Sequence, residues 1–123
     1  MSMIPPEKLE AYKRGALERE RRRRQEEARR RERAWQVARR AAALLKEQFG
    51  ATRVVVFGSL AHGAWFRLDS DIDLAAAGIP PEDFWRAWCA LDTVSEGFEI
   101  NLVALESAPD ALRQSIEAQG VEL

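Results

Sequence analysis

Two aspartates at alternate positions are the residues of this sequence best suited to carry chemistry. Asp71 and Asp73 lie in residues 70–75, Ser-Asp-Ile-Asp-Leu-Ala, whose alternating pattern predicts a β-strand. Ile72 and Leu74 would face the core, and both carboxylates would share the opposite face, about 6–7 Å apart along the chain. Mg²⁺ prefers a few carboxylates together with water and substrate phosphates, and paired metal ions clamp the oxygens of phosphoryl transfer. We therefore predict a metal site at Asp71 and Asp73, the alternative being a solvated edge strand.

A glycine-serine pair upstream is suited to hold the phosphates that such a metal accompanies. Gly58 and Ser59 follow a β-branched run at residues 53–57 and open a short helix over residues 58–63. Free backbone N–H groups at such a turn bind anionic oxygens, and glycine lets a phosphate approach closely. The Ser59 hydroxyl adds a donor. Taken alone, the pair also fits an ordinary turn and helix cap, so its weight comes from the aspartates that follow it.

The remaining patterns predict the elements that position these residues. After a long first helix we expect a strand at 53–57, a helix at 58–63, a strand at 70–75, a helix from Pro80, a strand at 98–103, and a last helix that begins at a capping box, Ser107–Asp110, and ends at Gly120. Phe84, Trp88 and Leu91 form the core face of the helix that begins at Pro80. Trp65 and Trp85, like Trp88, are expected in the core or at an interface rather than stacked on bases. The order predicts an α/β (α+β) domain with a small sheet flanked by helices.

The first helix is predicted to be unusually long. Residues 7–49 contain no proline and one glycine, Gly15, which is the weak point of a segment rich in good helix formers. An apolar stripe near its end should dock on the globular body: Trp35, Ala38, Ala42, Leu45 and Phe49. Residues 18–33 are almost entirely charged. Four acid-before-base pairs at i,i+4, each adding about 0.2–0.5 kcal/mol to helix stability, support them: Glu18–Arg22, Glu20–Arg24, Glu26–Arg30 and Glu27–Arg31.

The charge distribution divides the chain into two parts. Residues 1–48 hold 15 lysines and arginines against 8 acidic residues, whereas residues 49–123 hold 4 against 12. We predict a charged helical arm at residues 1–35 and a globular domain at residues 36–123. Because the arm has little apolar surface for the core, we expect it to project and to contact a partner or a second copy of this chain through Leu9, Tyr12 and Ala16.

Composition favours a cytoplasmic protein. The lone cysteine, Cys89, excludes an internal disulfide and suggests a reducing compartment. No apolar run approaches the roughly 20 residues that span a bilayer. The N-terminal residues also lack the basic-then-apolar order of a signal peptide.

The order of these residues resembles a known family. Phe57-Gly-Ser-Leu-Ala-His-Gly63, followed by Ser70-Asp-Ile-Asp-Leu74, resembles the Gly-Ser…Asp-x-Asp signature of the DNA polymerase β-like nucleotidyltransferases. The short chain resembles their minimal nucleotidyltransferase (MNT) branch, over roughly residues 36–123. The resemblance implies the nucleotidyltransferase fold, a mixed sheet flanked by helices, with Mg²⁺ and a nucleoside triphosphate such as ATP. Gly58 and Ser59 would then bind the triphosphate, and Asp71 and Asp73 the metal.

Three positions depart from the family pattern. Eleven residues separate Ser59 from Asp71, one more than the family spacing. His62 stands where many members carry arginine or lysine. It would contact phosphate when protonated, or else lie on the helix surface. Asn101 stands where a third acid is usual, and asparagine is neither a base nor a strong metal ligand. Glu99, two residues earlier on the same strand face, is the candidate to deprotonate an acceptor hydroxyl.

The resemblance implies an antitoxin that transfers AMP from ATP to a HEPN-domain partner and so silences a toxic ribonuclease. Two alternatives remain. Because Asn101 replaces an acid, the chain would be a catalytically weak binding protein that neutralises a HEPN partner by occlusion. The other alternative is a nucleic-acid-binding module that uses the arginine-rich helix, whose affinity would fall steeply with salt.

Overall fold

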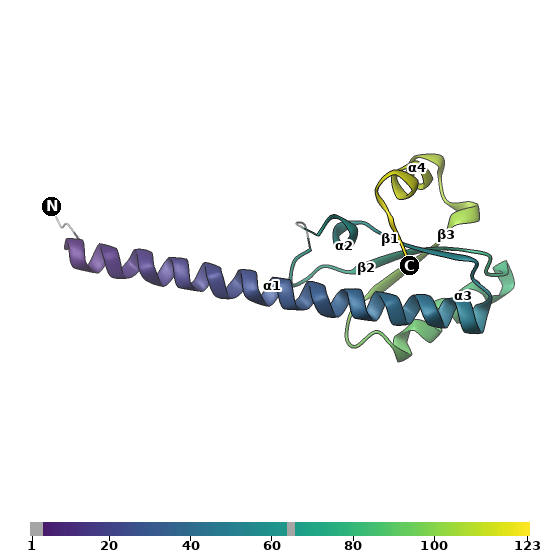
Figure 1. Cartoon of the computed structure of the whole chain (residues 1–123), viewed down its shortest axis with the longest axis horizontal. Helices are drawn as coiled ribbons and strands as arrows, with labels where there is room; N and C mark the ends of the chain where they lie inside the picture. Colours follow the sequence, from purple (N-terminus) through teal and green to yellow (C-terminus); the bar gives the residue numbers. More distant parts are fainter. Residues whose placement is uncertain (1–3, 64–65) are drawn as a thin grey trace.

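The computed structural model describes residues 4–63 and 66–123 of the chain, so Trp65 lies outside the described residues. The fold is α+β, with a long helix running along a small mixed sheet (Figure 1). The elements, with η marking a 3₁₀ helix, are α1 (Pro6–Phe49), β1 (Arg53–Phe57), α2 (Ser59–His62), β2 (Ile72–Ala77), η1 (Pro81–Asp83), α3 (Phe84–Ala90), η2 (Leu91–Thr93), β3 (Ile100–Ala104), η3 (Leu105–Ser107), α4 (Asp110–Gln119) and β4 (Val121–Glu122). The predicted fold class is confirmed.

The sheet has the strand order β3-β2-β1-β4. β1 runs antiparallel to β2 and β4, and β2 runs parallel to β3. A parallel pair needs a crossover, which η1, α3 and η2 provide between β2 and β3. In register, Phe57 lies opposite Asp73, and Asp73 lies opposite Asn101. The end of β1 and the starts of β2 and β3 therefore lie at the same end of the sheet.

Side-chain alternation divides the core between the two faces of the sheet. Val54 of β1 and Ile72 and Leu74 of β2 are buried in the larger cluster, with α1 and α3. Val55 and Ala75 point the other way and pack with α4 residues such as Ile116. Figure 1 shows α1 and α4 on opposite sides of the sheet. The inward orientation predicted for Ile72 and Leu74 is confirmed, and Asp73, between them, belongs to the α4 side.

The C-terminal part of α1 docks as its apolar stripe predicts. Ala38, Ala42 and Leu45 are buried, while Trp35 and Phe49 are partly buried against the larger cluster. Alanines dominate the buried face of the helix, so its backbone can approach the sheet closely. The helix ends at Gly50, which takes the left-handed conformation (φ 74°) expected of a C-terminal glycine.

The N-terminal part of α1 projects beyond the body, and it continues without a break through Gly15 (Figure 1). Apolar side chains near its free end are open to solvent: Leu9 is 44% exposed, Tyr12 69% and Leu17 67%. Among the described helices, α1 included, none is long and apolar enough to cross a membrane. The projecting part of the helix therefore leaves its apolar side chains in solvent rather than burying them against the body.

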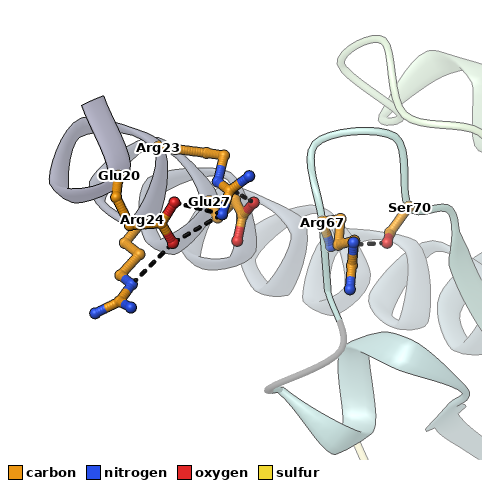
Figure 2. A network of polar contacts seen from close by, with 6 residues as sticks. All are labelled: Glu20, Arg23, Arg24, Glu27, Arg67 and Ser70. Atoms are coloured by element: carbon orange, nitrogen blue, oxygen red, sulfur yellow. Dashed lines mark hydrogen bonds and ion pairs between the residues drawn. The ribbon is translucent and has the colours of Figure 1, made fainter. Parts of the chain in front are cut away.

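Only two of the four predicted pairs along the arm form: Glu18–Arg22 at 3.8 Å and Glu20–Arg24 at 3.3 Å. Figure 2 shows Glu20 between Arg24 and Arg23, and Arg23 also reaches Glu27 at 3.9 Å. The pairs expected for Arg30 and Arg31 are absent from the described part of the chain because both side chains turn toward the body. An exposed i,i+4 pair is worth only about 0.3–0.5 kcal/mol, so contacts with the body displace it easily.

Several predicted boundaries were wrong. β2 begins at Ile72 rather than Ser70, and β3 begins at Ile100 rather than Phe98, so Asp71 and Glu99 precede their strands. The capping box at Ser107 is also wrong. Ser107 ends η3, and α4 begins after Pro109 without a side-chain cap. A proline there presets the backbone for the first helical turn, so the helix begins without the serine.

The short strand β4 had no signal in the sequence. It pairs with β1, with Val56 opposite Val121. Arg53 of β1 fastens the segment by pairing with Glu122 and, at 3.0 Å, with Glu117 of α4. Two residues are too few for a periodic pattern, so only the neighbouring strand defines this one. Trp85 does not lie in the core: it is 68% exposed and packs edge-on against Trp88, so its place at an interface stays a prediction.

Candidate active site

The predicted site residues gather at one end of the sheet because of strand direction. β1 leads into Gly58 and Ser59, whereas the antiparallel β2 begins near Asp71 and Asp73 at that same end. β3 runs parallel to β2, so its start, near Asn101, lies there too. Residues more than 40 positions apart in sequence thus share one corner of the molecule.

Asn101 joins the two aspartates. Its side-chain Nδ2 donates to Asp73 Oδ1 at 3.1 Å and lies 3.5 Å from Asp71 Oδ2. One amide group can reach both only if the two carboxylates lie on the same side of the sheet, as alternation predicted. All three side chains are partly buried. The structure therefore brings Asp71 and Asp73 together as one acidic pair.

Burial raises the pKa of the Asp73 carboxyl above its ordinary value. The partial loss of water is the main cause, the negative charge of Asp71 adds to it, and the hydrogen bond from Asn101 opposes it. Two neighbouring carboxylates held partly out of water are an arrangement that a cation stabilises. Apart from Asn101, the described residues place no positive or donating side chain within hydrogen-bond distance of the pair.

Gly58 lies directly against Asp73. Its backbone has φ 72° and ψ −149°, a region that in practice only glycine occupies. A Cβ on Gly58 would overlap Asp73 Oδ2 and lie 3.3 Å from its Cγ. Glycine is therefore required here twice, for the turn and for the close approach of the carboxylate. Ser59 follows as the first residue of α2, whose leading amides have no acceptor within the helix.

Glu99 and His62 lie at the edge of this corner. The Glu99 backbone carbonyl accepts a hydrogen bond from Ile72 N–H at 2.9 Å, which places the residue beside Asp71. Its side chain is exposed, and in the described chain it makes no hydrogen bond to either aspartate. His62 is the exposed last residue of α2. Both roles stay predictions.

The donor set suits Mg²⁺ rather than a metal held by protein alone. The described residues contain no group of three or more histidines, cysteines, aspartates or glutamates arranged to hold an ion. Mg²⁺ is usually bound through one or two carboxylates, with substrate phosphates and water completing its shell. Asp71 and Asp73 supply the carboxylates, and Gly58 lies directly against Asp73.

Sequence reasoning missed two features of this corner. It treated Asn101 only as a lost acid, whereas the side chain is a donor that bridges both carboxylates. It also placed Arg30 and Arg31 in the solvated arm, whereas both contact the loop that leads to Asp71. Neither contact has a local signal, since the partners are 28 to 40 positions away in the chain.

Comparison with known proteins identifies the family. The family model described as "Polymerase beta, Nucleotidyltransferase" matches residues 40–123, about two thirds of the chain, and includes every residue of this corner. The chain belongs to the polymerase β nucleotidyltransferase family. The match begins within α1, so the projecting arm lies outside the region that this nucleotidyltransferase shares with the family. No curated protein matches the chain significantly.

Solved structures agree with this assignment. A protein assigned as a minimal nucleotidyltransferase is 30% identical, with a TM-score of 0.59, over 73% of this chain and 95% of its own. A chain of a toxin–antitoxin complex with AMP-PNP is 27% identical, with a TM-score of 0.56, over 66% and 67%. The complex of a tri-AMPylated HEPN toxin with its MNT antitoxin from Shewanella oneidensis shares the fold, at 22% identity and a TM-score of 0.55, over 72% and 70%. The nucleotidyltransferase fold is thus shared with these relatives, two of which were solved as toxin–antitoxin complexes.

Proposed function

We propose that this nucleotidyltransferase is the antitoxin of a HEPN toxin and transfers AMP from ATP to a hydroxyl of that toxin, with Mg²⁺. The observation that carries the proposal is the contact of Gly58 with Asp73, which sets a phosphate-binding turn against an acidic pair. In one similar complex an MNT antitoxin is bound to a tri-AMPylated HEPN toxin, and another similar toxin–antitoxin structure contains AMP-PNP. Those relatives support the nucleotide and the acceptor class.

In the proposed reaction the acceptor oxygen forms a bond to the α-phosphorus of ATP. The bond from that phosphorus to the oxygen bridging the β-phosphate breaks, pyrophosphate leaves, and the hydroxyl proton passes to a base. The Gly58-Ser59 turn orients the triphosphate, with His62 available to a phosphate oxygen when protonated. When bound, Mg²⁺ offsets the charge that develops on the phosphoryl oxygens.

Asp71 and Asp73 hold the metal in this scheme, and Glu99 accepts the proton. Asn101 keeps the two carboxylates at a fixed separation, because one amide donates to both. Glu99 suits the role of base by its place beside Asp71 and by its exposure to an incoming acceptor.

The proposal is tested by transfer of label from α-labelled ATP to a HEPN protein co-purified with this chain. Replacing both site aspartates, Asp71→Asn with Asp73→Asn, should abolish transfer and metal-dependent nucleotide binding while the fold persists. Asp92→Asn, an exposed aspartate in η2, is the matched control and should behave as wild type. Equal labelling by the double variant would overturn the site assignment.

A second candidate function is neutralisation of the HEPN partner by occlusion alone. The observation in its favour is Asn101, an amide in place of a third acid, which leaves only the Asp71 and Asp73 carboxylates joined through it. In that case the double aspartate variant would still suppress the toxin in cells, and no label would appear on the partner. Suppression that depends on both aspartates decides for transfer.

A further inference from the structure

Two arginines of α1 reach the segment that connects the nucleotide-binding turn to the acidic pair. Arg31 Nη1 donates to the carbonyl of Gly63, the residue that directly follows α2, at 3.2 Å. Arg30 Nη2 lies 3.5 Å from the carbonyl of Ser70, the residue directly before Asp71. Adjacent residues of one helix thus contact the first and last residues of the segment 63–70.

The Arg30 side chain is held in place by the ring of Phe98. Its guanidinium carbon lies 4.2 Å from the centroid of the Phe98 ring, and that ring is nearly buried and packs at 6.5 Å from the ring of Phe66. The Arg30 Nε is buried and has no hydrogen-bond partner among the described residues. The Arg30 guanidinium does not pair with Glu26, and its Nε is shielded from water. The Phe98 ring and the Ser70 carbonyl together hold the side chain in this position.

Backbone hydrogen bonds also involve the two carbonyl-bearing residues that the arginines contact, Gly63 and Ser70. Phe66 N–H donates to the Gly63 carbonyl at 3.2 Å, the same oxygen that Arg31 contacts. Arg67 N–H donates to Ser70 Oγ at 2.8 Å and Ser70 N–H donates to the Arg67 carbonyl at 3.1 Å, a turn that Figure 2 shows. The three amides of Phe66, Arg67 and Ser70 therefore report on the order of this segment.

We propose that Arg30 and Arg31 are positioning residues of the nucleotide site, fixing Gly63 and Ser70 so that Asp71 meets Asp73 beside Gly58. The expected effect on nucleotide binding rests on the proposed function, whereas the expected effect on the order of Gly63 and Ser70 does not. Both arginines precede residue 40, where the family match begins, so in this proposal the site is completed by the part of α1 that precedes the shared domain. Nucleotide binding is thereby linked to the helix that carries the projecting arm.

The first test measures hydrogen exchange of the full chain without nucleotide. Arg30→Met with Arg31→Met keeps the helix and most of the apolar contact with Phe98 but removes both guanidinium groups. Exchange at the amides of Phe66, Arg67 and Ser70 should then become faster. Arg29→Met with Arg33→Met is the matched control, because both side chains are exposed and make no hydrogen bond or ion pair within the described chain. Unchanged exchange in the Arg30 and Arg31 variant overturns the proposal, whatever the protein binds.

The second test titrates the same proteins with Mg·ATP and measures AMP transfer to the partner. Loss of supporting contacts around a metal site typically costs about 10-fold to 100-fold in affinity or activity. We expect a loss of that size for the Arg30 and Arg31 variant, and none for the control pair. A wild-type chain that binds no Mg·ATP defeats the proposed function and leaves the exchange result to judge the positioning role. A wild-type chain that binds Mg·ATP, alongside a variant that binds equally well, defeats the positioning role alone.

Discussion

A methyl group added at Gly58 should damage the site more than the fold. In Gly58→Ala the new Cβ would overlap Asp73 Oδ2, and the backbone would keep φ 72° and ψ −149°. Holding a non-glycine residue in that region costs on the order of 1–3 kcal/mol of folding free energy. The overlap adds to this, because either the turn or the Asp73 side chain must move by roughly 1 Å, and a misplacement of that size costs about a hundredfold in rate.

The matched control is Gly50→Ala, at the end of α1. Gly50 also has a positive φ, 74°, but an added Cβ there meets no atom within 4 Å. This control carries backbone strain without a collision, so its stability should fall by roughly 1–2 kcal/mol, with Mg·ATP affinity unchanged. Denaturant unfolding measures the stability and calorimetric titration the affinity.

A double-mutant cycle isolates the collision. When Asp73→Ala removes the carboxylate that Gly58→Ala would strike, the stability cost of the Gly58 change should shrink. We expect a coupling energy of roughly 0.5–3 kcal/mol between the two positions, as for residues in direct contact. Additive effects in the cycle, or a Gly58→Ala protein with wild-type nucleotide affinity, would refute the reasoning.

Three further predictions follow from the same corner and from the arm. Because burial and Asp71 raise the pKa of Asp73, its ionisation opposes folding. Without metal, its contribution to stability should be lost as the pH rises above 3.8 through the raised pKa, so Asp73→Asn should melt higher than wild type at pH 7. Glu99→Gln should lower the transfer rate about 100-fold or more while Mg·ATP affinity stays, and a wild-type rate would end its role as base. Deleting residues 1–24 should leave Mg·ATP affinity intact but weaken assembly with a second copy or the HEPN partner in light scattering, whereas normal assembly would show that the arm makes no such contact.

The sequence alone determined the local chemistry and most of the elements. Alternation placed Asp71 and Asp73 on one face, since the period of a strand requires only the neighbouring residues. The apolar stripe of α1 located its docked end, because a helix repeats every three to four residues and alanine spacing shows the buried side. Gly58 and Ser59 were found by type and order, and Gly58 then proved to be in the conformation that glycine permits.

Tertiary structure decided what depends on distant partners. Whether the Arg30 side chain pairs with Glu26 on the same helix or turns toward Phe98 depends on a ring 68 positions away in the sequence, and no local pattern predicts it. The strand β4 exists because β1 offers it an edge, not because two residues favour extended backbone. Asn101 became a bridge between two carboxylates because parallel pairing sets it opposite Asp73. Periodicity reports which way a side chain points relative to its own element, and only the packed chain determines what it then meets.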